Sequence, residues 1–243
     1  MGKEKELGID HVYVVHAPKG YERHEKRLYD ILGRQYGFDF ELLDKDSDEL
    51  IPFYFVEDIH RIMNQGAVRC SLNHIMFYEA IVRRGDKIAL ILEDDPYFSK
   101  HFLKYLQQIV VESQTLQSGF FISLENSTLK FPPRKVIKKD KRLYEASYGR
   151  CAGAYLIDNT AAKNIIDRLK QNKCDKVIDH WHNDLINENV FKMYWAHPTC
   201  VEQGSINGKM SANNSTQHAG IIRRISWISQ KFYKTYILQI FNI

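Results

Sequence analysis

The chain has 243 residues, a length that fits one compact domain with a small appendage better than two full domains. Apolar residues make up 44% and charged residues 26% of it, a globular composition that excludes a disordered or fibrous protein. The net charge of +4 is too small to indicate nucleic-acid binding, so we expect no nucleic-acid partner.

The beginning of the chain predicts a β-α-β unit. Residues 11–15 form a short β-branched run typical of a buried strand, and residues 21–32 carry apolar side chains at helical spacing. Residues 38–43 predict a second strand, and the mixed, polar residues 44–64 predict a loop with one helical turn. Such an opening is typical of a parallel α/β sheet.

The middle of the chain continues this alternation. Residues 71–83 predict a helix that ends at Gly85. Residues 87–92 are the most hydrophobic run and predict a central strand. Residues 98–111 then predict a helix, and residues 119–124 another strand.

The next part adds extended structure over residues 144–157, a helix over 161–170 and a late strand over 191–196. Residues 202–220 are polar and rich in Gly, Ser and Asn, which is typical of an active-site lid. We therefore predict an α/β fold.

Residues 221–243 differ from the rest, because apolar side chains recur there at steps of three and four between basic ones. A basic amphipathic helix of this kind suits an anionic membrane surface, but it also suits docking on the domain core or on a partner. Both interpretations stay open. We expect residues 1–220 to form the main domain and residues 221–243 a C-terminal helix.

The four cysteines and the N-terminus indicate the compartment. The cysteines form no C-x-x-C pair and predict reduced thiols rather than a zinc site or a disulfide framework. The charged N-terminus lacks the apolar run of a signal peptide, and no stretch reaches the roughly 18 apolar residues of a spanning helix. We expect a cytoplasmic protein, with peripheral membrane contact through residues 221–243.

The strongest chemical signal is the triplet Glu93, Asp94 and Asp95 directly after the central strand. Three adjacent carboxylates repel one another, and nothing in the local sequence neutralises them. Open α/β sheets bind ligands at the carboxyl ends of their strands, and hard divalent cations select carboxylate oxygens. The triplet therefore predicts a cation that bridges to a diphosphate, although an exposed acidic turn before the next helix is the plainer alternative.

A second candidate segment runs over residues 178–184. It offers Asp179 and Asp184 as carboxylates able to accept a proton from a hydroxyl group, and Trp181 as an aromatic platform for a sugar ring. The alternative is an ordinary polar helix start. His74 is a further candidate, either to orient a phosphate or to satisfy a buried hydrogen bond.

Several of these segments form a series of landmarks that resembles glycosyltransferase family 25, the lipopolysaccharide and lipooligosaccharide glycosyltransferases that include the collagen galactosyltransferases. Residues 66–74 are similar to the family's Gly-x-x-Gly-Cys-x-x-Ser-His block, and residues 89–95 look like its acidic motif. The other landmarks are Glu22-Arg23, residues 153–157 before Ala162, Val177 to Asp179, and Pro198 to Gln203. His16, Arg69 and Asn73 depart from the family pattern.

The resemblance implies a GT-A-like nucleotide-diphospho-sugar transferase fold, a mainly parallel Rossmann-like sheet flanked by helices. It also implies Mn²⁺ or Mg²⁺ held by Glu93 and Asp95, with Asp94 near the sugar or ribose. Asp179 lies on the family motif and is the favoured base, with Asp184 second. The donor-binding candidates are Arg23, His74, Glu93, Asp94, Asp95 and Gln203.

We thus expect a metal-dependent, inverting transferase that moves galactose from UDP-galactose to a lipooligosaccharide or another surface glycan or glycolipid. Two alternatives remain: a catalytically weak relative that binds nucleotide-sugar or glycan, and a metal phosphohydrolase that uses the same carboxylates.

Overall fold

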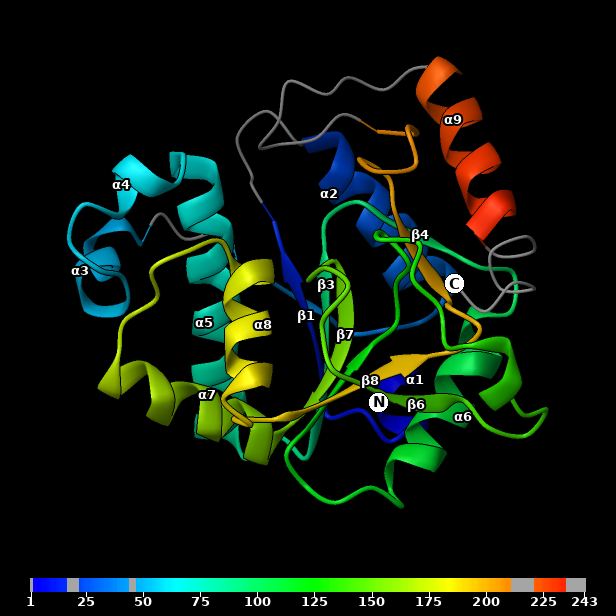
Figure 1. Ribbon diagram of the computed structural model, residues 1–243, viewed down its shortest axis with the longest axis horizontal. Helices are drawn as coiled ribbons and strands as arrows, with labels where there is room; N and C mark the ends of the chain where they lie inside the picture. The colour runs from blue at the N-terminus through cyan, green and yellow to red at the C-terminus, as the bar shows by residue number, and fades with distance from the viewer. Residues whose placement is uncertain (1, 17–21, 44–46, 211–220, 235–243) are drawn as a thin grey trace.

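A seven-stranded sheet with the order β2-β1-β3-β7-β5-β8-β6 lies at the centre of the computed structural model (Figure 1), which describes residues 2–16, 22–43, 47–210 and 221–234. Its strands are β1 (His11–Val15), β2 (Glu41–Leu43), β3 (Ile88–Glu93), β5 (Phe120–Ser123), β6 (Leu143–Ala146), β7 (Ala154–Asp158) and β8 (Lys192–Ala196). β7 is antiparallel to both β3 and β5, and β6 is antiparallel to β8, while the other pairings are parallel. Five of the seven strands therefore share one direction, which confirms the predicted α/β class with a mainly parallel sheet.

Helices cover both faces of this sheet (Figure 1). The α-helices are α1 (Lys3–Glu6), α2 (Glu22–Leu28), α3 (Ile51–Tyr54), α4 (Ile59–Ile62), α5 (Gln65–Arg84), α6 (Phe102–Ser113), α7 (Asn159–Gln171), α8 (Ile178–Asn187) and α9 (Ile221–Phe232). A π-helix, η1 (Tyr29–Gln35), continues α2, and two 3₁₀ turns are η2 (Asp48–Leu50) and η3 (Arg134–Val136).

The core is divided by the sheet because alternate strand residues point to opposite faces. Tyr13 and Val15 of β1 join the cluster beneath α5, α7 and α8, whereas Val12 and Val14 join the cluster beneath α1, α2 and α6. β3, buried on both faces, is a continuous apolar run for this reason.

The longest helix, α5, carries two of the predicted landmarks toward the sheet edge. The Asn64 side chain caps it by accepting a hydrogen bond from the Ala67 N–H, and Gly85 ends it in the left-handed conformation at φ 73°. The helix starts at Gln65, six residues before the predicted start at Ser71. The prediction rested on apolar spacing, whereas the residues before Ser71 join the helix behind the Asn64 cap. Cys70 and His74 thereby lie one turn apart on a rigid element.

A small second sheet completes the edge where β3 ends. β4 (Pro96–Phe98) pairs antiparallel with β9 (Val201–Gln203), so that Pro96 lies opposite Gln203. The sequence analysis gave residues 98–111 as one helix and residues 202–220 as a lid. β4 and β9 take the beginnings of these segments, and residues 211–220 lie outside the described part of the chain.

The predicted C-terminal helix is present as α9, whereas residues 235–243 of that prediction lie outside the described residues. Trp227 is buried, and Lys231 on the same helix face pairs with Glu202 of β9. Ile225, Ile228 and Phe232 are exposed on the other face. Across the described residues, none of the helices combines the length and apolarity needed to span a bilayer.

Candidate active site

The acidic triplet lies at the carboxyl edge of the sheet, and each of its side chains has a different environment. Glu93 is the last residue of β3, and Asp94 and Asp95 lead directly into β4. Of the three carboxylates, only Asp94 is paired, within the described residues, with charged residues from distant parts of the chain, His16 and His24. The partners of each carboxylate therefore indicate its role.

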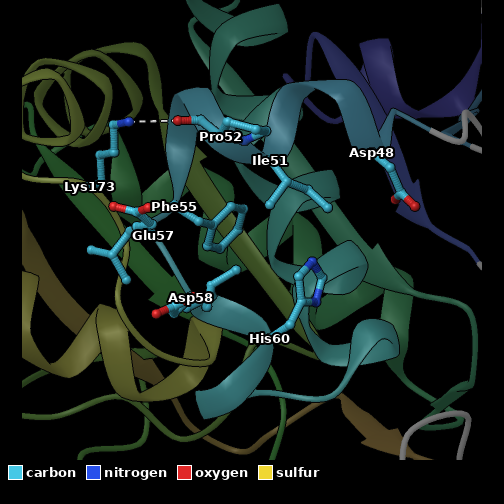
Figure 2. A pocket seen from close by; sticks show the side chains of 10 residues that line it. Asp48, Ile51, Pro52, Phe55, Glu57, Asp58, His60 and Lys173 are labelled. Carbon is cyan, nitrogen blue, oxygen red and sulfur yellow. Dashed lines mark hydrogen bonds between the residues drawn. The ribbon is translucent and has the colours of Figure 1, made fainter.

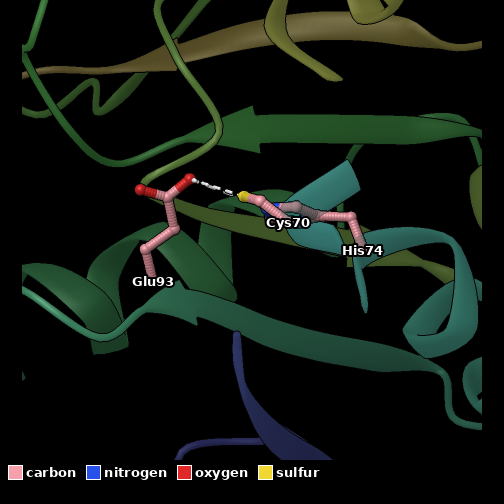
Figure 3. A group of neighbouring side chains, drawn as sticks. All are labelled: Cys70, His74 and Glu93. Carbon is pink, nitrogen blue, oxygen red and sulfur yellow. Dashed lines mark hydrogen bonds and ion pairs between the residues drawn. The ribbon is translucent and has the colours of Figure 1, made fainter. Parts of the chain in front are cut away.

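Glu93 lies between β9 and α5. Its Oε2 accepts a hydrogen bond of 2.6 Å from Nε2 of Gln203. Its Oε1 lies 3.8 Å from Sγ of Cys70 and 3.7 Å from Nε2 of His74, and Figure 3 shows this group. Burial, together with repulsion from Asp95 and Asp94, raises the pKa of Glu93 to about 8. A nearby cation would favour the ionised form of this carboxyl group.

Asp94 is held by two histidines that the sequence analysis did not connect to it. Nδ1 of His16, directly after β1, lies 2.8 Å from Asp94 Oδ2, and Nδ1 of His24 on α2 lies 3.2 Å from Oδ1. Burial alone would raise the pKa of Asp94, but the hydrogen bonds and charges of the two histidines outweigh it and lower the pKa to about 2. Asp94 is therefore an ionised residue that fixes β1 and α2 to the end of β3.

Asp95 retains one unsatisfied carboxylate oxygen. Its Oδ2 accepts a hydrogen bond of 2.7 Å from the Ser205 N–H, whereas its buried Oδ1 has no hydrogen-bond partner among the described residues. Burial raises the pKa of Asp95, against the opposing hydrogen bond from Ser205. A buried carboxylate oxygen without a partner is costly, and a hard cation is the ligand that would satisfy it.

Arg27, an α2 arginine that the sequence analysis did not select, contacts β4 at this edge. Its guanidinium lies 4.2 Å from the centre of the Tyr97 ring and donates to the Pro96 carbonyl oxygen. Burial lowers the pKa of Arg27, although the charges of Tyr97, Asp95 and Asp94 oppose this effect. Arg23 itself is exposed on α2.

Of the two predicted bases, the structure brings Asp179 to the site and leaves Asp184 away from it. Asp179, in the first turn of α8, accepts a hydrogen bond of 2.7 Å from the Ala152 N–H through Oδ1. Burial and the charge of Glu93 raise the pKa of Asp179 to about 6. Asp184 instead forms an ion pair of 2.5 Å with Lys176, and its side chain is 41% exposed.

The prediction that Trp181 is an aromatic platform for a sugar ring is wrong. This side chain is only 2% exposed and belongs to the hydrophobic core beneath α8. It points inward because the apolar face of α8 packs on the sheet, so it presents no ring to a sugar.

Glu125 is a site residue that the sequence analysis missed. Its fully buried carboxylate accepts hydrogen bonds from the Ser127 N–H at 2.6 Å and from the Cys151 N–H at 2.7 Å. Burial raises the pKa of Glu125 to about 7, against these bonds and the charge of Arg150. The Ser127 hydroxyl donates to Gln203 Oε1, and Gln203 Nε2 donates to Glu93. Ser127 and the Gln203 amide therefore connect Glu125 to Glu93. Glu125 directly follows the predicted strand at residues 119–124, and this position at the carboxyl end of a strand could have identified it as a candidate.

The described chain also contains a hollow of about 540 Å³ around α3 and α4 (Figure 2). Its lining includes Phe55 and His60, with Lys173 donating to the Pro52 carbonyl oxygen at its rim. None of the predicted site residues lines this hollow, so we place the chemistry at the carboxyl edge of β3 instead.

Replacing Gly153 by alanine is expected to destabilise the fold by about 1–3 kcal/mol through overpacking. A Cβ at this position would lie 2.4 Å from Cδ of Gln203, and the displaced amide would lose its bond to Glu93. Urea unfolding measures the effect. Gly33→Ala is the matched control, because its nearest atom beyond the chain neighbours is 3.9 Å from the new Cβ. Equal stability of the two variants would contradict the packing argument.

Comparison with known proteins places the chain in a family. The model of glycosyltransferase family 25 (LPS biosynthesis protein) matches residues 21–181. A glycosyltransferase 25 family member of Aedes aegypti is 25% identical over 198 residues, which cover 75% of this chain and 32% of that protein. Procollagen galactosyltransferase 1 of Danio rerio is 23% identical over 204 residues, which cover 79% and 34%.

A third relative carries a different description. The inactive glycosyltransferase 25 family member 3 of Homo sapiens is 28% identical over 127 residues, which cover 47% of this chain and 21% of that protein. The chain thus spans about a third or less of the length of these curated relatives. The family model covers most of the chain, including the acidic triplet, Cys70, His74 and Asp179, and the chain belongs to glycosyltransferase family 25.

Proposed function

We propose that this chain transfers a sugar from a nucleotide-diphosphate donor to a glycan acceptor, with UDP-galactose as the expected donor and a lipopolysaccharide or lipooligosaccharide as the expected acceptor. The observation that carries the proposal is the buried Oδ1 of Asp95 at the carboxyl end of β3, which has no hydrogen-bond partner in the part of the chain that the structure describes. Family membership supports the reaction class, and the family description supports the acceptor class.

The residues at this edge fit a hard divalent cation. Asp95 offers an oxygen with no hydrogen-bond partner among the described residues, and burial together with repulsion from Asp95 and Asp94 raises the pKa of Glu93. We expect Asp95 and Glu93 to hold Mn²⁺ or Mg²⁺. When bound, such an ion withdraws charge from the diphosphate leaving group.

The remaining steps belong to side chains of this chain. Asp179, fixed by the Ala152 N–H, accepts the proton of the acceptor hydroxyl as that oxygen attacks the sugar carbon. Asp94, with His16 and His24, keeps the end of β3 in place next to α2. Direct displacement by the acceptor inverts the configuration of the transferred sugar.

The acceptor class suggests a role for α9. Its exposed Ile225, Ile228 and Phe232 form an apolar face with Arg224 nearby, an arrangement that suits peripheral contact with an anionic membrane. The buried Trp227 and the pair Lys231–Glu202 join the other face to the main domain. Both interpretations left open by the sequence are therefore compatible with one helix.

A catalytically weak binding protein is the second candidate. It is favoured by the matched human relative that is named inactive and by the departures of this chain from the family block at Arg69 and Asn73. Arg69 forms a two-bond ion pair with Asp48, at 2.8 and 2.6 Å, which gives it a structural role instead. The two candidates differ in turnover and not in ligand.

Thermal unfolding with UDP and Mn²⁺ tests the proposed site. At a UDP concentration of about 100 Kd, the free energy of unfolding should rise by roughly 2.7 kcal/mol in the presence of Mn²⁺. Asp95→Asn should remove this increase, whereas the same change at the exposed Asp140 should leave it intact. If UDP does not stabilise the wild type, the donor assignment is contradicted. If UDP stabilises it but the protein does not turn over UDP-galactose, the second candidate, a binding protein, is favoured.

A further inference from the structure

Cys70, His74 and Glu93 form a group whose ligand atoms face one another. The Sγ atom, a ring nitrogen and a carboxylate oxygen all lie within 4.8 Å of one another. Figure 3 shows the three side chains. Cys70 and His74 come from adjacent turns of α5, and Glu93 comes from the end of β3. A thiol, an imidazole and a carboxylate together are a different ligand set from the oxygen ligands that Mn²⁺ and Mg²⁺ prefer.

The distances agree with a tetrahedral centre. Zinc bonds of about 2.3 Å to sulfur and about 2.0–2.2 Å to nitrogen and oxygen place neighbouring ligand atoms roughly 3.3–3.6 Å apart. The observed separations are 3.8 Å from Cys70 Sγ to Glu93 Oε1 and 3.7 Å from His74 Nε2 to the same oxygen. These two separations exceed the tetrahedral values by a few tenths of an ångström, and the third pair, Cys70 Sγ and a His74 ring nitrogen, lies within 4.8 Å.

The His74 ring supplies the independent observation that points to a ligand. This side chain is 0% exposed, and its Nε2 is buried without a hydrogen-bond partner among the described residues. Buried polar atoms are rarely left in this state, because an unmade hydrogen bond costs about 1–3 kcal/mol. The unsatisfied Nε2 lies 3.7 Å from Glu93 Oε1, on the side where a metal ion held with Cys70 would satisfy it.

A buried hydrogen-bond chain supports the ligating tautomer. His74 Nδ1 lies 2.7 Å from the Tyr155 hydroxyl, which lies 2.7 Å from the Tyr78 hydroxyl, which lies 2.8 Å from His182 Nε2. If each group donates to the next, His74 Nδ1 carries the proton and its Nε2 presents a lone pair. Metal-binding histidines are usually oriented by such a bond on the other ring nitrogen.

We propose that Cys70, His74 and Glu93 bind one Zn²⁺-class ion next to the hard cation expected at Asp95, with the Glu93 carboxylate shared between the two ions. Binding releases the Cys70 thiol proton to solvent and, at a pH where Glu93 is protonated, its carboxyl proton as well, so that a thiolate, a carboxylate and a neutral imidazole balance the two positive charges of the ion. Three protein ligands leave one coordination position open, as in catalytic rather than structural zinc sites. The prediction of four unliganded thiols then needs revision at Cys70.

Cobalt(II) titration of the chelator-treated full chain provides a spectroscopic test. The wild type should bind one Co²⁺ and develop a thiolate-to-cobalt charge-transfer band together with the strong visible bands of tetrahedral Co²⁺, and Zn²⁺ should abolish both. Cys70→Ser should lose the charge-transfer band. Cys174→Ser is the matched control, because this buried cysteine donates to the Lys176 carbonyl oxygen away from the group and should keep the band.

Asp95→Asn separates this site from the proposed donor site. It should retain the cobalt spectrum while losing the Mn²⁺-dependent stabilisation by UDP, and Cys70→Ser should show the reverse. The inference is overturned if the wild type gives no thiolate band, if the band survives in folded Cys70→Ser, or if Asp95→Asn abolishes it. If UDP does not bind, the donor assignment is contradicted, but the cobalt result still supports the Zn²⁺-class site. Circular dichroism of each variant establishes that it is folded.

Discussion

Replacing Asp179 by asparagine is expected to lower kcat for sugar transfer by about 10²–10⁴-fold, the contribution typical of a positioned general base. The asparagine Oδ1 can still accept the 2.7 Å hydrogen bond from the Ala152 N–H, so the loop before β7 should keep its place. The variant loses only the group that takes the proton. Initial rates with UDP-galactose and a glycan acceptor measure the effect, and UDP binding should be unchanged.

Asp184→Asn is the matched control for this prediction. Asp184 lies on the same helix, but its carboxylate pairs with Lys176 and is partly exposed. Its replacement should change kcat by less than about twofold, since an exposed ion pair contributes about 0–1 kcal/mol. A large loss in Asp184→Asn with a normal rate in Asp179→Asn would exchange the two assignments.

The same residue sets the expected pH dependence. Asp179 acts as a base only when ionised, and burial together with the charge of Glu93 raises its pKa to about 6. The rate should therefore fall about tenfold for each pH unit below 6 and become independent of this group above about pH 7. A profile that stays flat down to pH 5 would show that Asp179 is not the base.

The largest expected effect on stability comes from Asp158→Ala, about 3–5 kcal/mol in the free energy of unfolding. The Asp158 carboxylate caps α7 by accepting from the Ala161 N–H at 2.9 Å. It also accepts from the Gly119 N–H at 2.7 Å and the Phe120 N–H at 3.1 Å. Alanine removes a helix cap worth about 1 kcal/mol and leaves two buried donors unsatisfied at about 1–3 kcal/mol each.

Asn64→Ala tests whether burial, and not capping alone, accounts for this loss. Asn64 caps α5 with a single 2.9 Å bond to the Ala67 N–H at an exposed position, so its removal should cost about 1 kcal/mol. Urea unfolding of both variants gives the comparison. Similar losses in the two would mean that the Gly119 and Phe120 donors find other partners when Asp158 is removed.

Local sequence patterns predicted those elements whose apolar spacing reflects which of their faces are buried. β3 reads as a buried strand because both of its faces are covered, and α7 reads as a helix because one face alone packs on the sheet. β4 and β9 were missed, because each has three residues and exists only by pairing with the other. The direction of β7 between β3 and β5 has no signature in sequence, since it follows from the path of the whole chain.

The candidate site divides in the same way. Glu93, Asp95 and Asp179 lie in sequence motifs from which metal binding and proton transfer could be predicted. The carboxyl edge of an open α/β sheet is where such folds bind ligands. His16 and His24 precede their partner Asp94 by 78 and 70 residues, so only the fold shows that they neutralise it. The family motif favoured Asp179 over Asp184, and the structure adds the contact of each carboxylate: Asp179 accepts from the Ala152 N–H, whereas Asp184 pairs with Lys176.

The strand order also determines when in folding the site is completed. Among the described strands of the main sheet, β1 and β2 are the one neighbouring pair that is also consecutive in the chain. Every other pairing must first close a long loop, and sheets dominated by such contacts fold in milliseconds to seconds. The Ala152 N–H that fixes Asp179 and the Gly153 carbonyl that accepts the Glu93 N–H both enter with β7. A partly folded chain that lacks this strand thus holds neither contact, so we expect ligand binding at this edge to require that β7 has joined the sheet.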